Sequence, residues 1–459
     1  MSQQIIEHDY VVIGAGSGGL LVAVGIGKLG KDYAVVSGNI GGDCTHFGCV
    51  PSKTLLHFSK EYQTSCDLGE KEKIKYTTLQ KVQKKVQSFI KEENNLIPED
   101  RYHQGSAVFL NENTLEVSNG KNKKHLKFRK KCIIATGSRP RLIEIEGISQ
   151  DKIITNEDFF YLSKLPKSIT IIGGGPIGAE FATACASFDI ETHLVSSSYL
   201  PKEPKEIGEK SLASLQALGV KYHKAKPLRL EKKKLYLDNE TTIPETELYL
   251  SAVGRISNVN LNLEKAQVDY DNRGISVNKN LLTTNNDVFA IGDCTQNPQF
   301  THLAAHQGKF VLKKIALPFV QKRERALPRV TFTSPSISSV GELEEERGIK
   351  LFELKFSNTD KARTKYDQES YGIVAIDISS GRIVGASLFG DFGEDLISVF
   401  TLIVDERIPV LKLTDFITPY PTFANIFHTL SVDYLSYLSS NWKSMPFSVI
   451  KQFISYVIN

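Results

Sequence analysis

Residues Asp9 to Gly19 read DYVVIGAGSGG, an apolar strand that runs into a glycine-rich turn, and a helical pattern follows as far as Leu29. In a strand–turn–helix unit of this kind, the first glycine permits a tight turn and the second lets a pyrophosphate approach the backbone at the helix N-terminus. The third lets the helix pack closely against the strand. The stretch therefore predicts a dinucleotide site built on Gly14, Gly16 and Gly19.

The same pattern recurs from Ser168 to Gly178 (SITIIGGGPIG), with a helical run to about Phe188. Each copy is followed by another apolar strand, at residues 33–36 and 191–195. One such match is weak, but two matches in the same context favour two dinucleotide sites. The second site would use Gly173, Gly175 and Gly178.

A third apolar strand is expected from Asp287 to Ile291, and Asp293 lies two residues after it. Carboxylates at the C-terminal edge of a parallel sheet commonly bind ligand hydroxyls, although a helix N-cap is the alternative for this residue. After Arg329 the pattern changes to short strands at 373–376 and 383–388, then to helices from Gly393 onward. We interpret this last part as a separate α+β domain.

Composition sets limits on the class of protein. The 459 residues leave room for about three domains, and the formal charge of +4 gives no reason to expect a nucleic-acid partner. Six scattered cysteines, no signal-peptide pattern and no apolar run long enough to span a membrane predict a cytoplasmic protein. The basic run Lys121 to Lys131 predicts an exposed hairpin strand, and the apolar tail Met445 to Asn459 predicts a helix packed on its own domain rather than on a membrane.

One pair of cysteines stands out, in Gly41 to Lys53 (GGDCTHFGCVPSK). On an ideal helix, positions i and i+5 lie about 140° apart, so a disulfide between Cys44 and Cys49 requires a distorted backbone. The neighbouring glycines supply that freedom, and a strained bridge is easily reduced. Two buried thiols or half of a metal site are the alternatives, but we expect no metal because further Cys or His ligands are missing at suitable spacing.

These motifs together resemble the class I pyridine nucleotide-disulfide oxidoreductases, in particular the dihydrolipoamide dehydrogenase and mercuric reductase-like branch. The resemblance runs nearly from end to end, through both glycine motifs, Gly41 to Lys53, Ala135 to Pro140 (ATGSRP), Val253 to Arg255, Ala290 to Asp293 and Pro419 to Thr422.

The resemblance implies a fold and its domains. We expect an α/β protein with two Rossmann-like domains, which bind FAD and NAD(P)H, and a C-terminal α+β dimerisation domain. The expected boundaries are 1–148 and 269–326 for the FAD-binding part, 149–268 for the NAD(P)H-binding domain and 327–459 for dimerisation. A homodimer is also implied.

The resemblance further implies a role for each matching residue. Cys44 would exchange with the acceptor, Cys49 would face the flavin, and Lys53 would lie near flavin N5 and pair with Glu180. The remaining FAD contacts would come from Gly14, Gly16, Gly19, Ser37, Gly42, Asp43, Ala107, Thr136, Gly137, Gly254 and Asp293. Contacts to the nicotinamide dinucleotide would come from Gly173, Gly175, Gly178 and Ser196.

Several positions depart from the family pattern. Ser37 stands where a glutamate usually binds the adenosine ribose, and Ser196 stands where an acidic residue or arginine would separate NADH from NADPH. The segment Phe332 to Ile337 (FTSPSI) also lacks the usual acidic residue. The sequence therefore does not indicate whether the enzyme prefers NADH or NADPH.

The most consequential departure lies near the C-terminus. Disulfide-reducing members carry a histidine–glutamate acid–base pair, and the matching residues here are Tyr420 and Asn425. A phenol with an ordinary pKa near 10 and an amide that does not ionise replace an imidazolium poorly. Tyr420 is still the expected catalytic residue at this position, with His46 and His428 as alternative acids.

We interpret the chain as an NAD(P)H-dependent FAD enzyme that passes electrons through Cys44 and Cys49 to a small acceptor: a disulfide, a soft metal ion or a quinone-like molecule. Two alternatives stay open. One is a dihydrolipoamide dehydrogenase with an unconventional acid, and the other is a degenerate scaffold that binds FAD without turnover.

Overall fold

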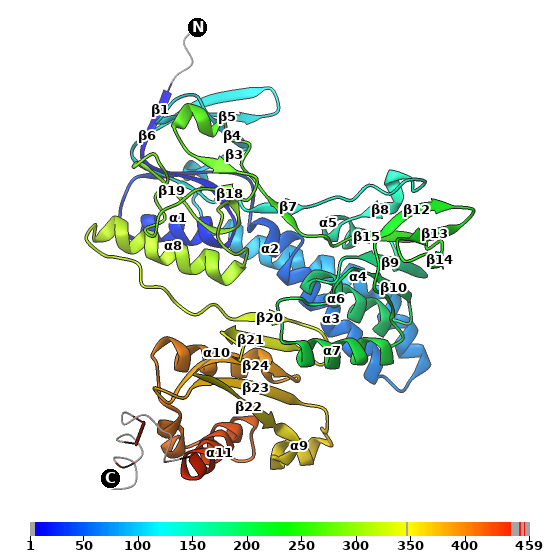
Figure 1. Ribbon diagram of the computed structural model, residues 1–459. Coiled ribbons are helices and arrows are strands. Elements are labelled where there is room, and N and C mark those ends of the chain that lie inside the picture. Colours follow the sequence, from blue (N-terminus) through cyan, green and yellow to red (C-terminus); the bar gives the residue numbers. More distant parts are fainter. Residues whose placement is uncertain (1–4, 346–347, 442–448, 451–453, 455–459) are drawn as a thin grey trace. The chain divides into compact units, whose positions relative to one another are not determined.

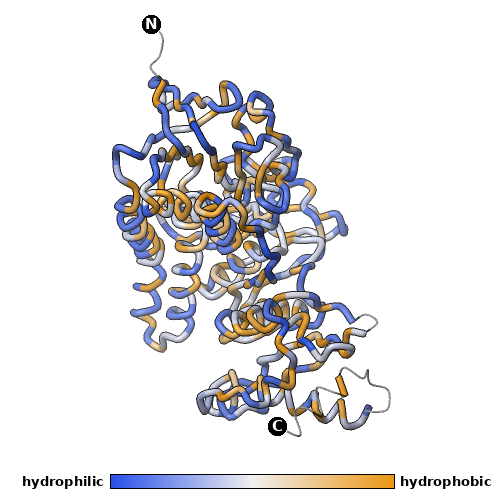
Figure 2. Tube along the Cα trace, turned by 90° about the vertical axis from the view of Figure 1, so that its left-hand side faces the viewer, coloured by the Kyte–Doolittle hydropathy of each residue, from blue (hydrophilic) through white to orange (hydrophobic). Residues whose placement is uncertain are grey.

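The structure is a computed structural model that describes residues 5–345, 348–441, 449–450 and 454. The chain divides into two compact units. The first unit comprises Met1–Ile169, Leu228–Tyr236 and Thr242–Arg323, and the second comprises Thr170–Pro227, Leu237–Thr241 and Glu324–Asn459. Within the units, hydrophobic stretches (orange) alternate with hydrophilic ones (blue) along the helices and strands, as Figure 2 shows.

The first unit holds the N-terminal glycine motif and the cysteine pair (Figure 1). Its main strands are β1 (Ile5–Ala15), β2 (Tyr33–Ile40), β3 (Tyr102–Gln104), β4 (Ser106–Phe109), β5 (Thr114–Asn119), β6 (Asn122–Ile134) and β19 (Val288–Ala290). Its helices are α1 (Ser17–Lys28), α2 (Gly42–His46), α3 (Cys49–Thr64), α4 (Leu68–Asn94), α5 (Asn156–Phe159) and α8 (Thr301–Ala316). Short strands complete it: β7 (Ser138–Pro140) with β16 (Arg255–Ser257), β8 (Ile153–Ile154) with β15 (Leu248–Ser251), β17 (Tyr270–Asp271) with β18 (Gly274–Ile275), and the group β12 (Pro227–Glu231), β13 (Lys234–Leu237) and β14 (Thr242–Pro244).

A seven-stranded sheet forms the centre of this unit, in the order β3-β2-β1-β6-β5-β4, with β19 also paired to β6. Strands β1, β2, β3, β6 and β19 run parallel, and β4 and β5 join antiparallel. The carboxyl ends of β1, β6 and β19 therefore meet at one edge, which is where ligands bind in sheets of this kind. The three motifs that follow these strands are thereby brought together.

The apolar runs of the parallel strands are buried on both faces. Val11 and Ile13 pack into a core with β4 and β5, whereas Tyr10 and Val12 pack into a core with α1 and α8. Alternate side chains of a strand point to opposite faces, so an uninterrupted apolar run is what a sheet covered on both sides requires. Figure 1 shows α1 and α8 side by side against the sheet.

The expected hairpin strand at Lys121 to Lys131 is confirmed as part of β6, which pairs antiparallel with β5. Leu126 and Phe128 are buried, while Lys123, Arg129 and Lys130 are exposed on the solvated side. Acidic partners neutralise several of these charges: Glu116 binds Lys123 at 2.8 Å, and Asp9 binds Lys130 at 2.8 Å.

The second unit holds the other glycine motif and the C-terminal α+β part. Its elements are β9 (Ser168–Ile172, which begins just before the unit boundary), α6 (Pro176–Ser187), β10 (Glu191–Val195), α7 (Lys205–Ala217), β11 (Lys221–His223), β20 (Arg329–Thr331), β21 (Ile337–Gly341), β22 (Ile349–Lys355), α9 (Asp360–Lys365), β23 (Tyr371–Asp377), β24 (Arg382–Phe389), α10 (Gly393–Asp405) and α11 (Ile426–Asn441). Strand β10 lies between β9 and β11, and the order β20-β21-β24-β23-β22 forms an antiparallel sheet.

Several predicted elements of the second unit are confirmed. The strand expected at 191–195 is β10, and the strands expected at 373–376 and 383–388 lie within β23 and β24. The expected C-terminal helices include α10 and α11, whose apolar faces pack on the antiparallel sheet. The tail expected to form a helix from Met445 lies almost wholly outside the described residues.

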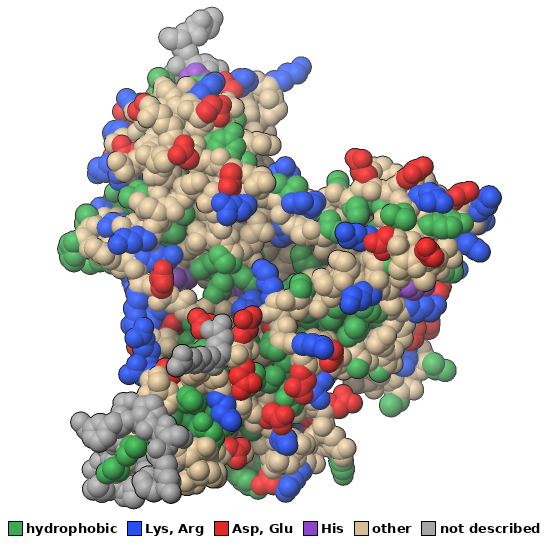
Figure 3. All heavy atoms as spheres, in the orientation of Figure 1, with side chains coloured by type: hydrophobic (Ala, Val, Ile, Leu, Met, Phe, Trp, Pro, Cys, Tyr) green, Lys and Arg blue, Asp and Glu red, His purple; other side chains and the backbone are tan. Residues whose placement is uncertain are grey.

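Over much of the drawn face, Lys and Arg side chains are interspersed with Asp and Glu (Figure 3). None of the helices in the described ranges is both long and apolar enough to cross a membrane.

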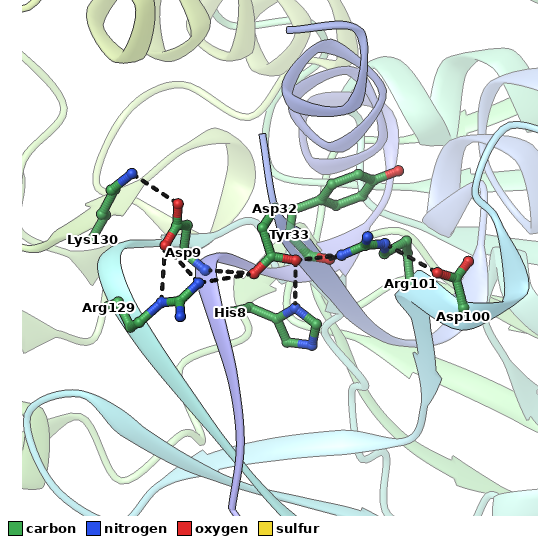
Figure 4. Close-up of polar contacts among 8 residues, drawn as sticks. All are labelled: His8, Asp9, Asp32, Tyr33, Asp100, Arg101, Arg129 and Lys130. Atoms are coloured by element: carbon green, nitrogen blue, oxygen red, sulfur yellow. Dashed lines mark hydrogen bonds and ion pairs between the residues drawn. The ribbon is translucent and has the colours of Figure 1, made fainter. Parts of the chain in front are cut away.

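A network of hydrogen bonds and ion pairs centred on Asp32 connects β1 with the start of β2 (Figure 4). The Asp32 carboxylate accepts hydrogen bonds from His8 Nδ1 and from the Asp9 backbone N–H, both at 3.1 Å, and from Arg101. Burial alone would raise the pKa of Asp32, but these hydrogen bonds more than offset it, so the pKa lies below its usual value.

We expect Asp32→Asn to lower the free energy of unfolding by about 1–3 kcal/mol at neutral pH, because hydrogen bonds to a charged acceptor contribute about that much. Urea denaturation measures the change. Since the pKa of the folded state is depressed, the stabilisation is present above the unfolded pKa near 4 and is lost as the pH falls through the folded value. Wild type and variant should therefore converge in acid.

Asp100→Asn is the matched control, since the Asp100 side chain is 73% exposed and binds only the edge of the same network, at 3.2 Å from Arg101. An equal loss in both variants, or a difference that does not change with pH, contradicts the role given to Asp32.

Candidate functional site

The first glycine motif has the geometry that its sequence predicts. Gly14 has φ +98°, and a Cβ at this position would lie 2.3 Å from the Ala135 carbonyl oxygen. A Cβ at Gly19 would lie 2.0 Å from the Gly14 oxygen, so the helix packs against the turn as close as backbones allow. At Gly16 the nearest atom is 3.7 Å away, which leaves its backbone open at the N-terminus of α1.

The second motif repeats this geometry within the second unit. Gly173 has φ +121°, and a Cβ at Gly178 would lie 1.9 Å from the Gly173 oxygen. Gly175 is the N-cap of α6 and has no heavy atom within 4 Å of its Cβ direction. Each of the two turns thus combines one glycine with positive φ, one open glycine and one tightly packed glycine, as a dinucleotide site requires.

The cysteine segment is joined to the first motif by two glycines. Gly42 has φ +62°, and a Cβ on it would lie 2.6 Å from Gly16 Cα. This contact places the start of α2 against the start of α1, so any larger residue would push the two apart.

The distortion expected between the cysteines is present as a break between two helices. Helix α2 ends at His46, Gly48 is the N-cap of α3, and Cys49 is the first residue of α3. A Cβ at Gly48 would lie 3.0 Å from Asp43 Oδ2 and 3.1 Å from Cys44 Cα, so a side chain here would be tightly packed and its neighbours would have to shift slightly. The break brings both sulfurs to the same place.

Both cysteines are thiols in the structure, and their environments differ. The hydrogen bond with Cys49, together with burial and the nearby Cys49 charge, raises the pKa of the Cys44 thiol far above its usual value. Cys49 Sγ lies 3.4 Å from Thr301 Oγ1, at the start of α8. Cys49 is therefore the better placed of the two to carry a negative charge.

A cavity of about 400 Å³ lies beside these residues. Its lining combines the α1 turn, the cysteine segment and the strand ends of the first unit: Gly14, Ala15, Gly16, Ser17, Gly18, Ser37, Asn39, Gly42, Asp43, Cys44, His46, Phe47, Ala135, Thr136, Gly137, Ser138, Arg139, Glu157, Asn258, Ile291, Gly292, Asp293, Thr301 and Ala304. Most of the expected FAD contacts are therefore gathered around one space.

A chain of polar contacts crosses the wall of this cavity. Ser138 Oγ donates to Asp293 Oδ2 at 2.9 Å, and Arg255 Nε donates to Ser138 Oγ at 2.7 Å. Arg255 Nη2 lies 3.0 Å from Asp43 Oδ1, so the same guanidinium neutralises the acid that precedes Cys44. Burial raises the pKa of Asp293, only partly opposed by Ser138 and Arg255. Asp293 is thus suited to accept hydrogen bonds from ligand hydroxyls.

These observations fit FAD. The N-terminus of the 12-residue helix α1 has no side-chain cap and no acidic residue in its first turn, which suits a pyrophosphate. The open backbone at Gly16 suits the phosphates, and half-buried Asp293 suits the polyol chain.

Not every expected contact lies on the cavity. Ser37 and Asp43 line the cavity, but the Ser37 hydroxyl donates a hydrogen bond to the Asn39 carbonyl at 2.7 Å. Ala107 is buried on β4 opposite Val117, and Gly254, with φ +108°, precedes β16; neither is among the cavity-lining residues of the described chain.

The expected residues outside this cavity lie as follows. Lys53 follows Cys49 by one turn of α3. Glu180 is buried in α6 and accepts a hydrogen bond from the Phe332 backbone N–H at 3.0 Å. The Ser196 hydroxyl donates a hydrogen bond to the Ser198 carbonyl at 2.7 Å, within the same loop.

Tyr420 and His428, two of the expected residues of the C-terminal part, are exposed. Tyr420 is 73% exposed, and its hydroxyl donates to Asp360 at 3.0 Å, a contact that raises its pKa above 10. Asn425 accepts a hydrogen bond from Thr418 at 2.7 Å, and His428 is exposed on α11. His46 lines the cavity, with Nε2 placed 2.8 Å from the Ile40 carbonyl.

Four polar residues of the site were missed from the sequence: Ser138, Arg255, Asn258 and Thr301. Asn258 bonds the Thr136 carbonyl at 3.0 Å, and the other three act as described above. Ser138 and Arg255 lie inside two of the family motifs, Ala135 to Pro140 and Val253 to Arg255. Their polar side chains within these motifs could have marked them as site residues. Thr301 carried none, because only the fold brings α8 to Cys49.

We expect Gly42→Ala to weaken FAD binding roughly tenfold or more, because forcing a side chain into this left-handed, crowded position costs at least about 1–2 kcal/mol. Flavin fluorescence during titration of the apoprotein measures the affinity. Gly38→Ala on β2 is the control, since its Cβ would meet no atom within 4 Å. Equal affinities for FAD in the two variants contradict the contact between α1 and α2.

Comparison with known proteins shows which family the chain resembles. The family pattern described as pyridine nucleotide-disulphide oxidoreductase matches residues 8–308, and the dimerisation domain of the same family matches residues 327–431. The chain is 30% identical over 448 residues to dihydrolipoyl dehydrogenase of Geobacillus stearothermophilus, which covers 92% of this chain and 95% of that protein.

Two further relatives extend the comparison. Mercuric reductase of Bacillus cereus is 29% identical over 454 residues, covering 91% of this chain and 70% of that protein. The structure of the HOCl-induced flavoprotein disulfide reductase RclA of Escherichia coli superposes with a TM-score of 0.82 at 25% identity, covering 93% of this chain and 99% of that one. The chain belongs to the pyridine nucleotide-disulphide oxidoreductase family of FAD-dependent, NAD(P)H-using enzymes.

Proposed function

We propose that the enzyme takes two electrons from NADH or NADPH and delivers them, by way of FAD and the Cys44–Cys49 pair, to a small acceptor. The observation that carries this proposal is the meeting of both sulfurs at the N-terminus of α3, beside the cavity that fits FAD. When bound, FAD supplies the centre that accepts a hydride and passes electrons on.

In this proposal the two cysteines have different roles, because their surroundings differ. Cys49 begins a 16-residue helix, whose N-terminal dipole favours a thiolate, and Thr301 lies within hydrogen-bond reach of its sulfur. The pKa of Cys44 is raised by Cys49 and by burial, so in this proposal Cys44 ionises after Cys49 and reacts as its thiolate when it exchanges with the acceptor. Cys49 is therefore the proposed partner of the flavin, and Cys44 the thiol that attacks.

Lys53 and Glu180 support this arrangement in the proposal. Lys53 lies four residues after Cys49 on α3, so both side chains project from one face of the helix. An ammonium there favours the Cys49 thiolate, and Glu180 would hold the ammonium in place. The roles of Gly173, Gly175, Gly178 and Ser196 are to bind NADH or NADPH without a charged selector for the ribose.

Proton transfer at the acceptor falls to Tyr420 in this proposal, in a homodimer formed through the C-terminal domain. Because Asp360 raises the pKa of Tyr420, its phenol stays protonated at neutral pH and donates a proton only weakly. The enzyme is then suited to acceptors that depend little on an acid at sulfur.

A second candidate is dihydrolipoamide dehydrogenase activity. The 30% identity with the Geobacillus enzyme over nearly the whole chain favours it. The absence of a histidine at position 420 argues against it, so turnover with lipoamide should be slow.

Differential alkylation tests the cysteine relay. We expect the FAD-loaded enzyme to protect Cys44 and Cys49 from iodoacetamide as a disulfide, and anaerobic NADH or NADPH to make Cys44 reactive, as read by peptide mass spectrometry. Exposed Cys66 should react in both samples, and buried Cys132, Cys185 and Cys294 in neither. Equal labelling of Cys44 with and without the nucleotide contradicts the relay.

Removal of one sulfur gives a second test. We expect Cys44→Ser to leave reduction of the flavin by NADH or NADPH in place and to lower steady-state turnover of disulfide acceptors by at least about 100-fold, since covalent catalysis loses its nucleophile. Turnover unchanged with every acceptor would take the cysteines out of the mechanism.

A further inference from the structure

Glu157 lines the cavity that fits FAD, which we call the FAD cavity, and has no part in the proposed electron path. It lies on α5, a single turn that a capping box between Thr155 and Asp158 holds in place. Asn156 Nδ2 donates a hydrogen bond to the Phe47 carbonyl at 2.8 Å, so α5 is fastened to the break between the two cysteines. The Glu157 carboxylate is thereby fixed in the wall of the cavity.

This wall carries more carboxylates than cations. Asp43 and Asp293 line the cavity together with Glu157, and Arg139 is the exposed guanidinium of the lining. Arg255 pairs with Asp43 at 3.0 Å and so compensates the charge of that residue. No ion pair joins the Glu157 side chain to a cation in the part of the chain that the structure describes. Glu157 is therefore the carboxylate of this wall whose charge is least compensated.

The surroundings of Glu157 favour its neutral form. Burial raises the pKa of the carboxyl above its usual range, and the negative charge of Asp43 raises it further. Arg255 opposes this shift, and Asp158 on α5 adds to it. The other ionisable side chains of the lining are Cys44, His46, Arg139 and Asp293.

FAD brings the negative charges of its pyrophosphate into this cavity. The α1 turn that suits the pyrophosphate touches the start of α2 through Gly16 and Gly42, and Asp43 is the next residue. An added negative charge disfavours a carboxylate nearby, most strongly where water is excluded. Because Arg255 is already engaged by Asp43, binding of FAD shifts Glu157 further towards its protonated form.

We propose that Glu157 takes up a proton from solvent when FAD binds, so that it lines the occupied site as a neutral carboxylic acid. The neutral acid has an O–H group that donates a hydrogen bond, whereas the carboxylate only accepts and repels a phosphate. The affinity for FAD is then highest at a pH where Glu157 is protonated with and without FAD. It falls as the pH rises through the pKa of the FAD-free protein, and levels off above the pKa of the FAD-bound protein. This inference does not depend on the cysteine relay or on the acceptor.

The affinity for FAD of the full-length wild type and of Glu157→Gln, followed by flavin fluorescence over about pH 5–9, tests the proposal. Glutamine has the donor and the acceptor of the neutral acid but does not titrate. We expect the two proteins to bind FAD alike in acid, and the variant to bind it about tenfold more tightly in base, since one pKa unit corresponds to that factor. A substitution that only damaged the fold would weaken binding instead.

Glu144→Gln is the matched control, because Glu144 is exposed and lies outside the lining of the FAD cavity. It should follow wild type at every pH. The contribution of His46 is common to wild type and Glu157→Gln, so the ratio of their affinities isolates Glu157. Equal or weaker binding of FAD by Glu157→Gln in base overturns the proposal.

Proton uptake gives a reading that needs no variant. Calorimetric titration with FAD in two buffers of different ionisation enthalpy gives the number of protons bound per FAD. Wild type should take up as much as about one proton in the range where its affinity changes with pH, and Glu157→Gln markedly less. No uptake in wild type at any pH, or the same uptake in both proteins, which would assign the proton to another group such as Asp293, contradicts the proposal.

Discussion

The backbone contact between Gly16 and Gly42 is the constraint on which the site depends. It joins a turn that offers its backbone to a dinucleotide with the segment that carries both cysteines. A single added methyl group at position 42 would overlap Gly16 Cα, so the spacing between α1 and α2 is set by the absence of side chains. The break at Gly48 then turns Cys49 back toward Cys44. The glycine turn and the cysteine pair thereby lie beside the same cavity.

Charged and polar contacts centred on Arg255 also hold the residues of the cavity in place. Arg255 lies within reach of Asp43 and Ser138, and Ser138 in turn holds Asp293, so two carboxylates at the cavity are tied to one cation. Without that guanidinium, the acid that precedes Cys44 would repel a pyrophosphate bound beside it. The two thiols also affect each other, because the hydrogen bond with Cys49, burial and the charge of Cys49 raise the pKa of Cys44.

The sequence was sufficient to predict the parts of the molecule that follow from local pattern. Both glycine turns, β10, the basic strand within β6 and the break between the cysteines all arise from residues close together in the chain. The polar partners were harder, because their positions depend on where distant segments meet. Thr301 lies 252 residues from Cys49, and Arg255 lies 117 residues from Ser138.

Anaerobic titration of the FAD-loaded enzyme with NADH and with NADPH tests the central claim most directly, because the visible spectrum reports on the flavin and on its contact with Cys49. The account predicts reduction by two electrons per chain to a species with long-wavelength thiolate–flavin absorbance, which Cys49→Ser abolishes. A flavin that neither nucleotide reduces, or one that bleaches fully without that absorbance, would contradict it.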